Sequence, residues 1–179
     1  MTFSRSSLGF VVTLASVVLA GCYETREPVI GRGVDMPLEP GTFRCQNDKN
    51  RDSSVATISA AARLGADDVV YVATLDKDRY AVRAAALPEG LFLLEARGDF
   101  RGAQLVFVRR LDADRYELLV TASRARDRLT ALAQTHGVKI EFPNYGPPRI
   151  DGPPDRQRAF LLAHTSTVLE RTAVCRRAP

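Results

Sequence analysis

Residue types suited to catalysis are scarce in this chain. Its two histidines are His136 and His164, and Ser166 follows the second by two positions. Residues two apart on a helix do not face each other, so this serine and histidine cannot form a nucleophile–base pair there. No G-x-S-x-G, H-E-x-x-H, phosphate-binding glycine loop or C-x-x-C motif occurs after residue 22. The sequence therefore predicts no catalytic residue. His136 is expected to be a cation at a helix C-terminus, and His164 a hydrogen-bonded, partly buried residue inside a helix.

An internal repeat carries two pairs of carboxylates. Leu75–Tyr80 (LDKDRY) recurs as Leu111–Tyr116 (LDADRY). Calcium loops are rich in D-x-D pairs, but they need further oxygen ligands and usually a Gly and a distal Glu, which neither copy has. We interpret both copies as hairpin turns in which Asp bonds its own backbone, Arg faces water and Tyr starts the next strand. No metal site and no cofactor is predicted.

The first 22 residues have the features of a targeting segment. Arg5 precedes an apolar run, Leu8 to Ala20, which has the length of a signal-peptide core and is too short to span a bilayer. The run ends Leu19-Ala20-Gly21-Cys22. This resembles the lipobox of bacterial lipoproteins, in which the cysteine is acylated and becomes the new N-terminus. The alternatives are an ordinary secretory peptide or a buried helix that ends in Gly-Cys.

The resemblance implies a signal peptide over 1–21 and lipid on Cys22 that anchors the chain in the bacterial cell envelope, facing the periplasm. Tyr23 stands where an Asp would resemble an inner-membrane retention signal, which favours the outer membrane. Residues 22–41 contain three prolines and three glycines without sustained periodicity. They predict an irregular tether that lifts one globular domain, 42–179, off the membrane, with Val29-Ile30 apolar enough to dock on it.

Two cysteines remain if Cys22 carries lipid. Cys45 and Cys175 lie near the two ends of the predicted domain, and an oxidising envelope favours a disulfide between them. Closing a loop of more than about 100 residues would contribute roughly 4–5 kcal/mol in the chain-entropy model. Two unpaired thiols, or a metal pair that lacks other ligands, are the alternatives.

The charge of the chain is mild and interspersed. The 25 basic and 21 acidic residues give a net charge of +4, which falls to +3 without the leader because Arg5 is its one charged residue. This balance argues against a nucleic-acid partner. Arg124, Arg126 and Arg128 could contact an anionic surface, as could Arg109-Arg110 and the group Arg171, Arg176 and Arg177. The alternative is that these arginines are scattered, solvated side chains.

Short runs rich in β-branched and aromatic residues dominate the first two thirds of the predicted domain. Turn residues bound them at spacings of about a dozen residues, which indicates antiparallel neighbours without crossover helices. The runs cover residues 42–46, 69–74, 80–86, 91–96, 103–109, 116–120 and, later, 138–142. Residues 55–63 suit either strand or helix, and the tight turn that follows them favours strand.

Helical periodicity appears twice. One apolar face runs from Ser123, a predicted N-cap, to Gly137, a predicted C-terminal cap. A second helix is predicted over about 155–173, with His164 toward the core. The fold class is therefore α+β: an antiparallel meander of six to eight strands, curled or a partial barrel, with one helix before the last strand and a helix at the C-terminus.

The sequence alone predicts a membrane-anchored envelope lipoprotein that acts as a non-enzymatic binding or assembly module, with an envelope protein or a cell-wall polymer as its partner. A carrier of a small apolar ligand in a barrel-like cavity is the alternative. An envelope enzyme without a recognisable motif is the third hypothesis. The sequence contains no signal for the oligomeric state.

Overall fold

Eight antiparallel strands close into a barrel. The computed structural model describes residues 23–34, 39–49, 51–59, 62–63, 68–75, 77–98, 102–144 and 146–179. Each barrel strand pairs with the next, and the last pairs with the first, so the ring has no free edge. The ring consists of β2 (Gly41–Asn47), β3 (Ser53–Ile58), β5 (Val69–Leu75), β6 (Asp78–Ala86), β7 (Leu91–Arg97), β8 (Ala103–Arg110), β9 (Arg115–Thr121) and β12 (Leu169–Arg177). The predicted fold class is confirmed.

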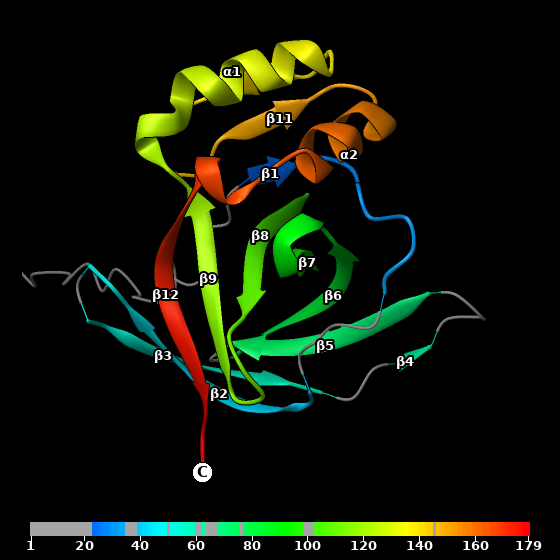
Figure 1. Ribbon diagram of the computed structural model, residues 1–179. Helices are drawn as coiled ribbons and strands as arrows, with labels where there is room; N and C mark the ends of the chain where they lie inside the picture. The colour runs from blue at the N-terminus through cyan, green and yellow to red at the C-terminus, as the bar shows by residue number, and fades with distance from the viewer. Residues whose placement is uncertain are drawn as a thin grey trace, which may run out of the picture.

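A cap is inserted into the chain between β9 and β12 (Figure 1). It contains α1 (Arg126–Thr135), β10 (Lys139–Glu141), β11 (Arg149–Asp151) and α2 (Pro154–Leu162). The strand β1 (Tyr23–Thr25) joins it, because β1 pairs with β11 on one side and with the barrel strand β8 on the other. Gly137 ends α1 in the left-handed conformation, with φ of 64°, as predicted. The predicted N-cap at Ser123 is wrong, because Ser123 lies in the short 3-10 helix η3 (Ser123–Ala125) that precedes α1.

Alternating side chains on the barrel strands separate two hydrophobic cores. On β7, Leu94 and Ala96 point into the barrel, whereas Leu91 and Leu93 point outward, and all four are buried. The outward side chains of β7, β8 and β9 pack against the cap and form the outer core. β7 is therefore covered on both faces, which explains its almost unbroken apolar sequence.

The C-terminal part of the chain differs from the prediction. The predicted helix over 155–173 is present only as α2, and residues 169–177 form β12, a central barrel strand. A register shift between Arg171 and Ala173 breaks the alternation of β12, so its apolar residues appear at spacings that resemble a helix. Residues 55–63, which were ambiguous, contain β3 and the short strand β4 (Ala62–Arg63).

The predicted disulfide is present. Cys45 and Cys175 are directly paired across β2 and β12 and joined by an S–S bond of 2.01 Å. Both side chains are buried inside the barrel. Because β2 and β12 are the first and last strands of the ring, the disulfide crosses the pairing that closes the barrel.

The second copy of the repeat is a hairpin turn, as predicted. Asp112 Oδ1 accepts a hydrogen bond of 3.0 Å from the backbone N–H of Asp114, Arg115 is exposed, and Tyr116 is buried in β9. In the first copy, Asp76 lies outside the described residues. Among the described residues, no helix has the length and apolar composition needed to span a membrane.

Candidate functional site

The segment that follows Cys22 is packed against the body. Residues 23–34, here called the strap, were predicted to be part of an irregular tether, with Val29 and Ile30 able to dock. Val29 and Ile30 are indeed buried, but so are Tyr23 and Thr25, and the strap begins with a strand, β1. The first part of the expected tether is therefore part of the fold. Cys22 itself lies outside the described residues.

β1 is hydrogen-bonded into the sheet on both sides. Tyr23 pairs with Leu105 of β8, and the backbone N–H of Glu24 donates to the carbonyl oxygen of Pro148 at 3.0 Å. The side chain of Arg149 reaches Glu24 with an N–O distance of 3.3 Å. Tyr23, the first residue after Cys22, is thus part of the sheet through its backbone.

Tyr23 is bonded to the only fully buried histidine. The Nδ1 atom of His164 lies 2.9 Å from the carbonyl oxygen of Phe160, which can only accept, so Nδ1 carries the proton. The Nε2 atom is then an acceptor, and the Tyr23 hydroxyl donates to it at 2.7 Å. Phe107 stacks on the imidazole with a centroid distance of 5.0 Å, and Phe160 meets it edge-on at 4.8 Å.

These surroundings keep His164 neutral. Burial lowers its pKa from the ordinary value of 6.5 to about 4, because desolvation disfavours the charged imidazolium. The prediction that His164 is hydrogen-bonded is confirmed, but the residue is fully rather than partly buried, and it lies just beyond α2 rather than inside a helix. His136 directly follows α1, at the predicted helix end.

The middle of the strap binds a buried carboxylate. Glu95 Oε2 accepts hydrogen bonds from the backbone N–H groups of Val29 at 2.7 Å and Ile30 at 2.8 Å. Glu95 is 1% exposed, and Arg97 lies 3.4 Å from its other oxygen. Glu95 was not among the residues singled out from the sequence. The available signal was a single acidic residue within the apolar run of β7, where a buried charge needs donors.

The end of the strap is clamped at Gly33. Its N–H donates to Asp68 Oδ1 at 3.0 Å, and its carbonyl accepts from the N–H of Val69 at 3.1 Å. Arg83 forms a bidentate ion pair with Asp68, with N–O distances of 3.1 Å to Oδ1 and 2.9 Å to Oδ2. This hydrogen bonding from Arg83, with the N–H of Gly33, lowers the pKa of Asp68 to about 2. A methyl group on Gly33 would lie 2.1 Å from the Val69 oxygen, so only glycine fits here.

A groove of about 330 Å³ lies beside the first residue of β1. On β8, Leu105 pairs with Tyr23 and Phe107 pairs with Leu119, so β1 begins close to the end of β9. The groove is lined by residues from the end of β9, from α1 and from the segment that leads to β11; these include Thr121, Ser123, Arg126, Leu129, Phe142 and Pro148. Pro148 is the residue that accepts the hydrogen bond from Glu24. The groove combines apolar walls with one guanidinium group.

The three arginines of the predicted anionic contact surface are exposed at the start of α1, with Asp127 among them. Arg126 lies over the ring of Phe142 at 4.7 Å. None of the three makes an ion pair with a described residue. The structure therefore places Arg126 at the groove, with Arg124 in η3 and Arg128 in the first turn of α1.

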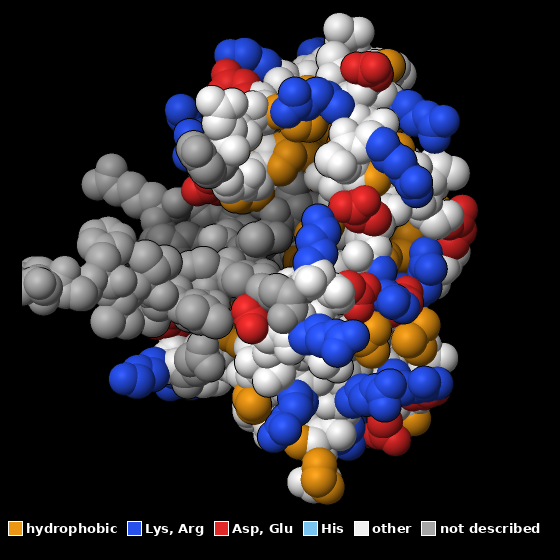
Figure 2. All heavy atoms as spheres, turned by 90° about the vertical axis from the view of Figure 1, so that its left-hand side faces the viewer, with side chains coloured by type: hydrophobic (Ala, Val, Ile, Leu, Met, Phe, Trp, Pro, Cys, Tyr) orange, Lys and Arg blue, Asp and Glu red, His pale blue; other side chains and the backbone are white. Residues whose placement is uncertain are grey.

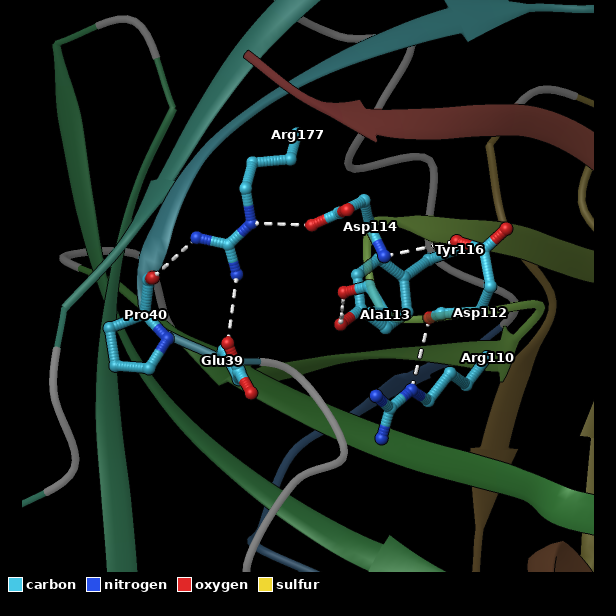
Figure 3. A network of polar contacts seen from close by, with 8 residues as sticks. All are labelled: Glu39, Pro40, Arg110, Asp112, Ala113, Asp114, Tyr116 and Arg177. Carbon is cyan, nitrogen blue, oxygen red and sulfur yellow. Dashed lines mark hydrogen bonds and ion pairs between the residues drawn. The ribbon is translucent and has the colours of Figure 1, made fainter. Parts of the chain in front are cut away.

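The other predicted basic groups have different surroundings. Arg171 pairs with Asp48 and Glu117, and Arg109 also reaches Glu117. Arg177 donates to Asp114, Glu39 and the Pro40 carbonyl, and its guanidinium lies 5.3 Å from the Phe43 ring centre (Figure 3). These contacts tie the chain end to the β8–β9 turn and to the approach to β2. They are structural.

The barrel interior holds a small apolar cavity of about 120 Å³. It is lined mainly by aliphatic and aromatic side chains and by the disulfide; the lining includes Phe43, Tyr80, Leu94, Val108, Tyr116, Cys45 and Cys175. Pockets for drug-sized ligands usually measure about 300–1,000 Å³. This cavity is large enough only for a very small apolar molecule.

Within the described parts of the chain, no group of three or more His, Cys, Asp or Glu side chains is placed to hold a metal ion. Comparisons of the chain with protein-family models, curated proteins and solved structures find no match. The candidate site consequently depends on the geometry alone. It comprises the strap, the groove beside it and the position of Cys22 one peptide bond away.

We expect Gly33→Ala to destabilise the protein. The added methyl group cannot coexist with the Val69 carbonyl, so either the end of the strap or β5 must move, at a cost of about 1–3 kcal/mol. Gly31→Ala is the matched control, because a methyl group on Gly31 meets nothing within 4 Å. The measurement is the free energy of unfolding in urea, with limited proteolysis of residues 23–34. Equal stability of the two variants would show that the strap is not clamped at Gly33.

Stability is expected to fall between pH 7 and pH 4 because of His164. Its pKa is lower in the folded chain, so the unfolded chain takes up the proton first, and about 3 kcal/mol is lost between pH 6.5 and pH 4. NMR tests the cause directly because the chain has two histidines, His136 and His164. The His164 ring signal should remain that of a neutral imidazole at pH 5 in the folded protein. An imidazolium signal at that pH would contradict the buried, neutral state.

Proposed function

We propose that this chain is a bacterial envelope lipoprotein anchored by lipid on Cys22, with a non-enzymatic binding or assembly role at the membrane. The lipobox-like sequence Leu19-Ala20-Gly21-Cys22 suggests the anchor. The observation that supports it best is the position of the fold relative to this cysteine. Tyr23, the residue after this cysteine, is buried and pairs with β8, so cleavage before Cys22 would leave the described body intact.

The disulfide is compatible with an oxidising compartment such as the periplasm. The outer membrane is favoured over the inner membrane by Tyr23, on the sequence argument alone. A partner is expected to be an envelope protein or a cell-wall polymer.

A binding role is preferred over catalysis because the buried ionisable residues named above each have a structural partner. His164 is bonded to Tyr23 and Phe160, and Glu95 to the strap. Asp68, which has the most strongly shifted carboxylate, is occupied by Arg83 and Gly33. These groups hold elements together and do not converge on a common cleft.

A carrier of a small apolar ligand remains the second candidate, and the interior cavity is the observation that favours it. Its walls are almost entirely apolar, and an apolar cavity of about 150 Å³ in another protein stays dry and binds benzene or xenon. The volume of about 120 Å³ limits the ligand to a comparable size. A fatty acid or another long-chain ligand would require the barrel to expand.

The anchor is tested with Cys22→Ser in the full chain. We expect the wild-type chain to fractionate with membranes and to release a peptide from its N-terminus with the mass of an acylated cysteine. Cys22→Ser should keep its leader or appear in the soluble periplasmic fraction. Cys45→Ser with Cys175→Ser controls for the loss of cysteine as such and should remain membrane-bound. Retention of a leader-cleaved Cys22→Ser chain in the membrane after salt washing, or a wild-type N-terminal peptide without acyl groups, would refute the lipid anchor.

A further inference from the structure

We propose that the strap holds one face of the body directly on the bilayer, so that the groove beside β1 lies at the level of the phospholipid headgroups. This inference rests on the proposed function, since it requires lipid on Cys22. It adds a membrane contact surface and an orientation, which an anchor alone does not specify.

The distance between Cys22 and the body is short. A flexible tether of twenty residues extends by up to about 3.3 Å per residue, or roughly 65 Å. Consecutive Cα atoms lie about 3.8 Å apart, so the Cα of Cys22 is one such step from Tyr23. Tyr23 is 0% exposed and pairs with Leu105. If Cys22 carries lipid, no flexible linker therefore separates the acylated residue from the folded body.

The strap is attached to the body at several independent points. Tyr23 is bonded to His164, Val29 and Ile30 to Glu95, and Gly33 to Asp68 and Val69. The backbone of Val34 also donates to the Ala84 carbonyl at 2.9 Å. Releasing the strap would expose its apolar side chains and leave the Glu95 carboxylate without two donors. The short connection is consequently a property of the folded state.

The surface at this end of β1 has basic and apolar side chains. In Figure 1, β1 lies beneath the cap and next to β8, and α1 starts at the upper left. Figure 2, which looks at the left-hand side of Figure 1, shows Lys and Arg side chains next to hydrophobic ones. The groove offers apolar side chains from Leu129 and Phe142 and the guanidinium of Arg126. Apolar walls with unpaired arginines match a phospholipid surface, because anionic headgroups attract arginines and the interface accepts aromatic rings.

The chain contains no tryptophan, so one introduced tryptophan reports on a single position. Ser123→Trp places the probe on an exposed residue that lines the groove. Ala62→Trp is the matched control, because Ala62 is also exposed and β4 lies on the opposite side in Figure 1. Phe142→Trp serves as a second probe of the groove. Each acylated full-length variant is reconstituted in vesicles of phosphatidylethanolamine and phosphatidylglycerol, with or without lipids brominated near the headgroup.

We expect brominated lipids to quench Ser123→Trp and Phe142→Trp strongly and to leave Ala62→Trp unchanged. A flexible insert of twenty Gly and Ser residues between Cys22 and Tyr23 should abolish this contrast, because the body can then leave the surface. Mass spectrometry of the N-terminal peptide separates the two hypotheses. Acylated Cys22 with no quenching contrast, or a contrast that survives the insert, would overturn the orientation set by the strap and leave the anchor intact. A chain without acyl groups would overturn both.

Discussion

The buried carboxylate of Glu95 makes the strap and the barrel depend on each other. A charge in the outer core of a protein is tolerated only with hydrogen-bond donors and an opposite charge nearby. Arg97 supplies the charge, and the backbone N–H groups of Val29 and Ile30 supply the donors. Burial of Glu95 in the barrel strand β7 is therefore energetically tolerable only when the strap is in place. Conversely, the buried side chains of the strap need the outer face of β6, β7 and β8 to cover them.

Most of the barrel could be predicted from the sequence because its strands follow one another along the chain. Turn residues bound each strand from β5 to β9, and alternating side chains reveal which face is inward. The disulfide followed from the number and position of the cysteines. These features are local, or depend on simple counts.

The elements that the sequence did not reveal are those that depend on distant partners. β1 and β11 are three residues long, and the pairing between them joins Glu24 to Arg149, two residues that are far apart in the sequence. β12 has a bulge that conceals its alternation, and it is a strand because it pairs with both β2 and β9. Gly33 allows the strap to approach β5 because it has no side chain; a Cβ atom would clash with the Val69 carbonyl. A glycine alone in the sequence does not reveal such a close approach. Cys22 was identified from its motif, whereas the packing of the residues after it required the structure.

The strap is important for how it attaches the body to Cys22, and not for any reaction that its residues carry out. In the described chain, polar groups with altered pKa values, such as His164 and Asp68, stabilise packing around the strap. The region just after Cys22 acts as a rigid connection in place of a flexible one. If Cys22 carries lipid, the working surface of the body is restricted to what can be reached from a fixed position at the membrane.

Hydrogen exchange of the strap amides tests this account most directly. The N–H groups of Val29 and Ile30 are bonded to Glu95 and lie in the outer core, and the N–H group of Val34 is bonded to the Ala84 carbonyl. We predict that these amides are protected from exchange to the same extent as the amides of Leu93 and Phe107 in β7 and β8. Exchange at the rate of an unstructured peptide, with β7 and β8 still protected, would show that the strap is a loose tether and would contradict the account.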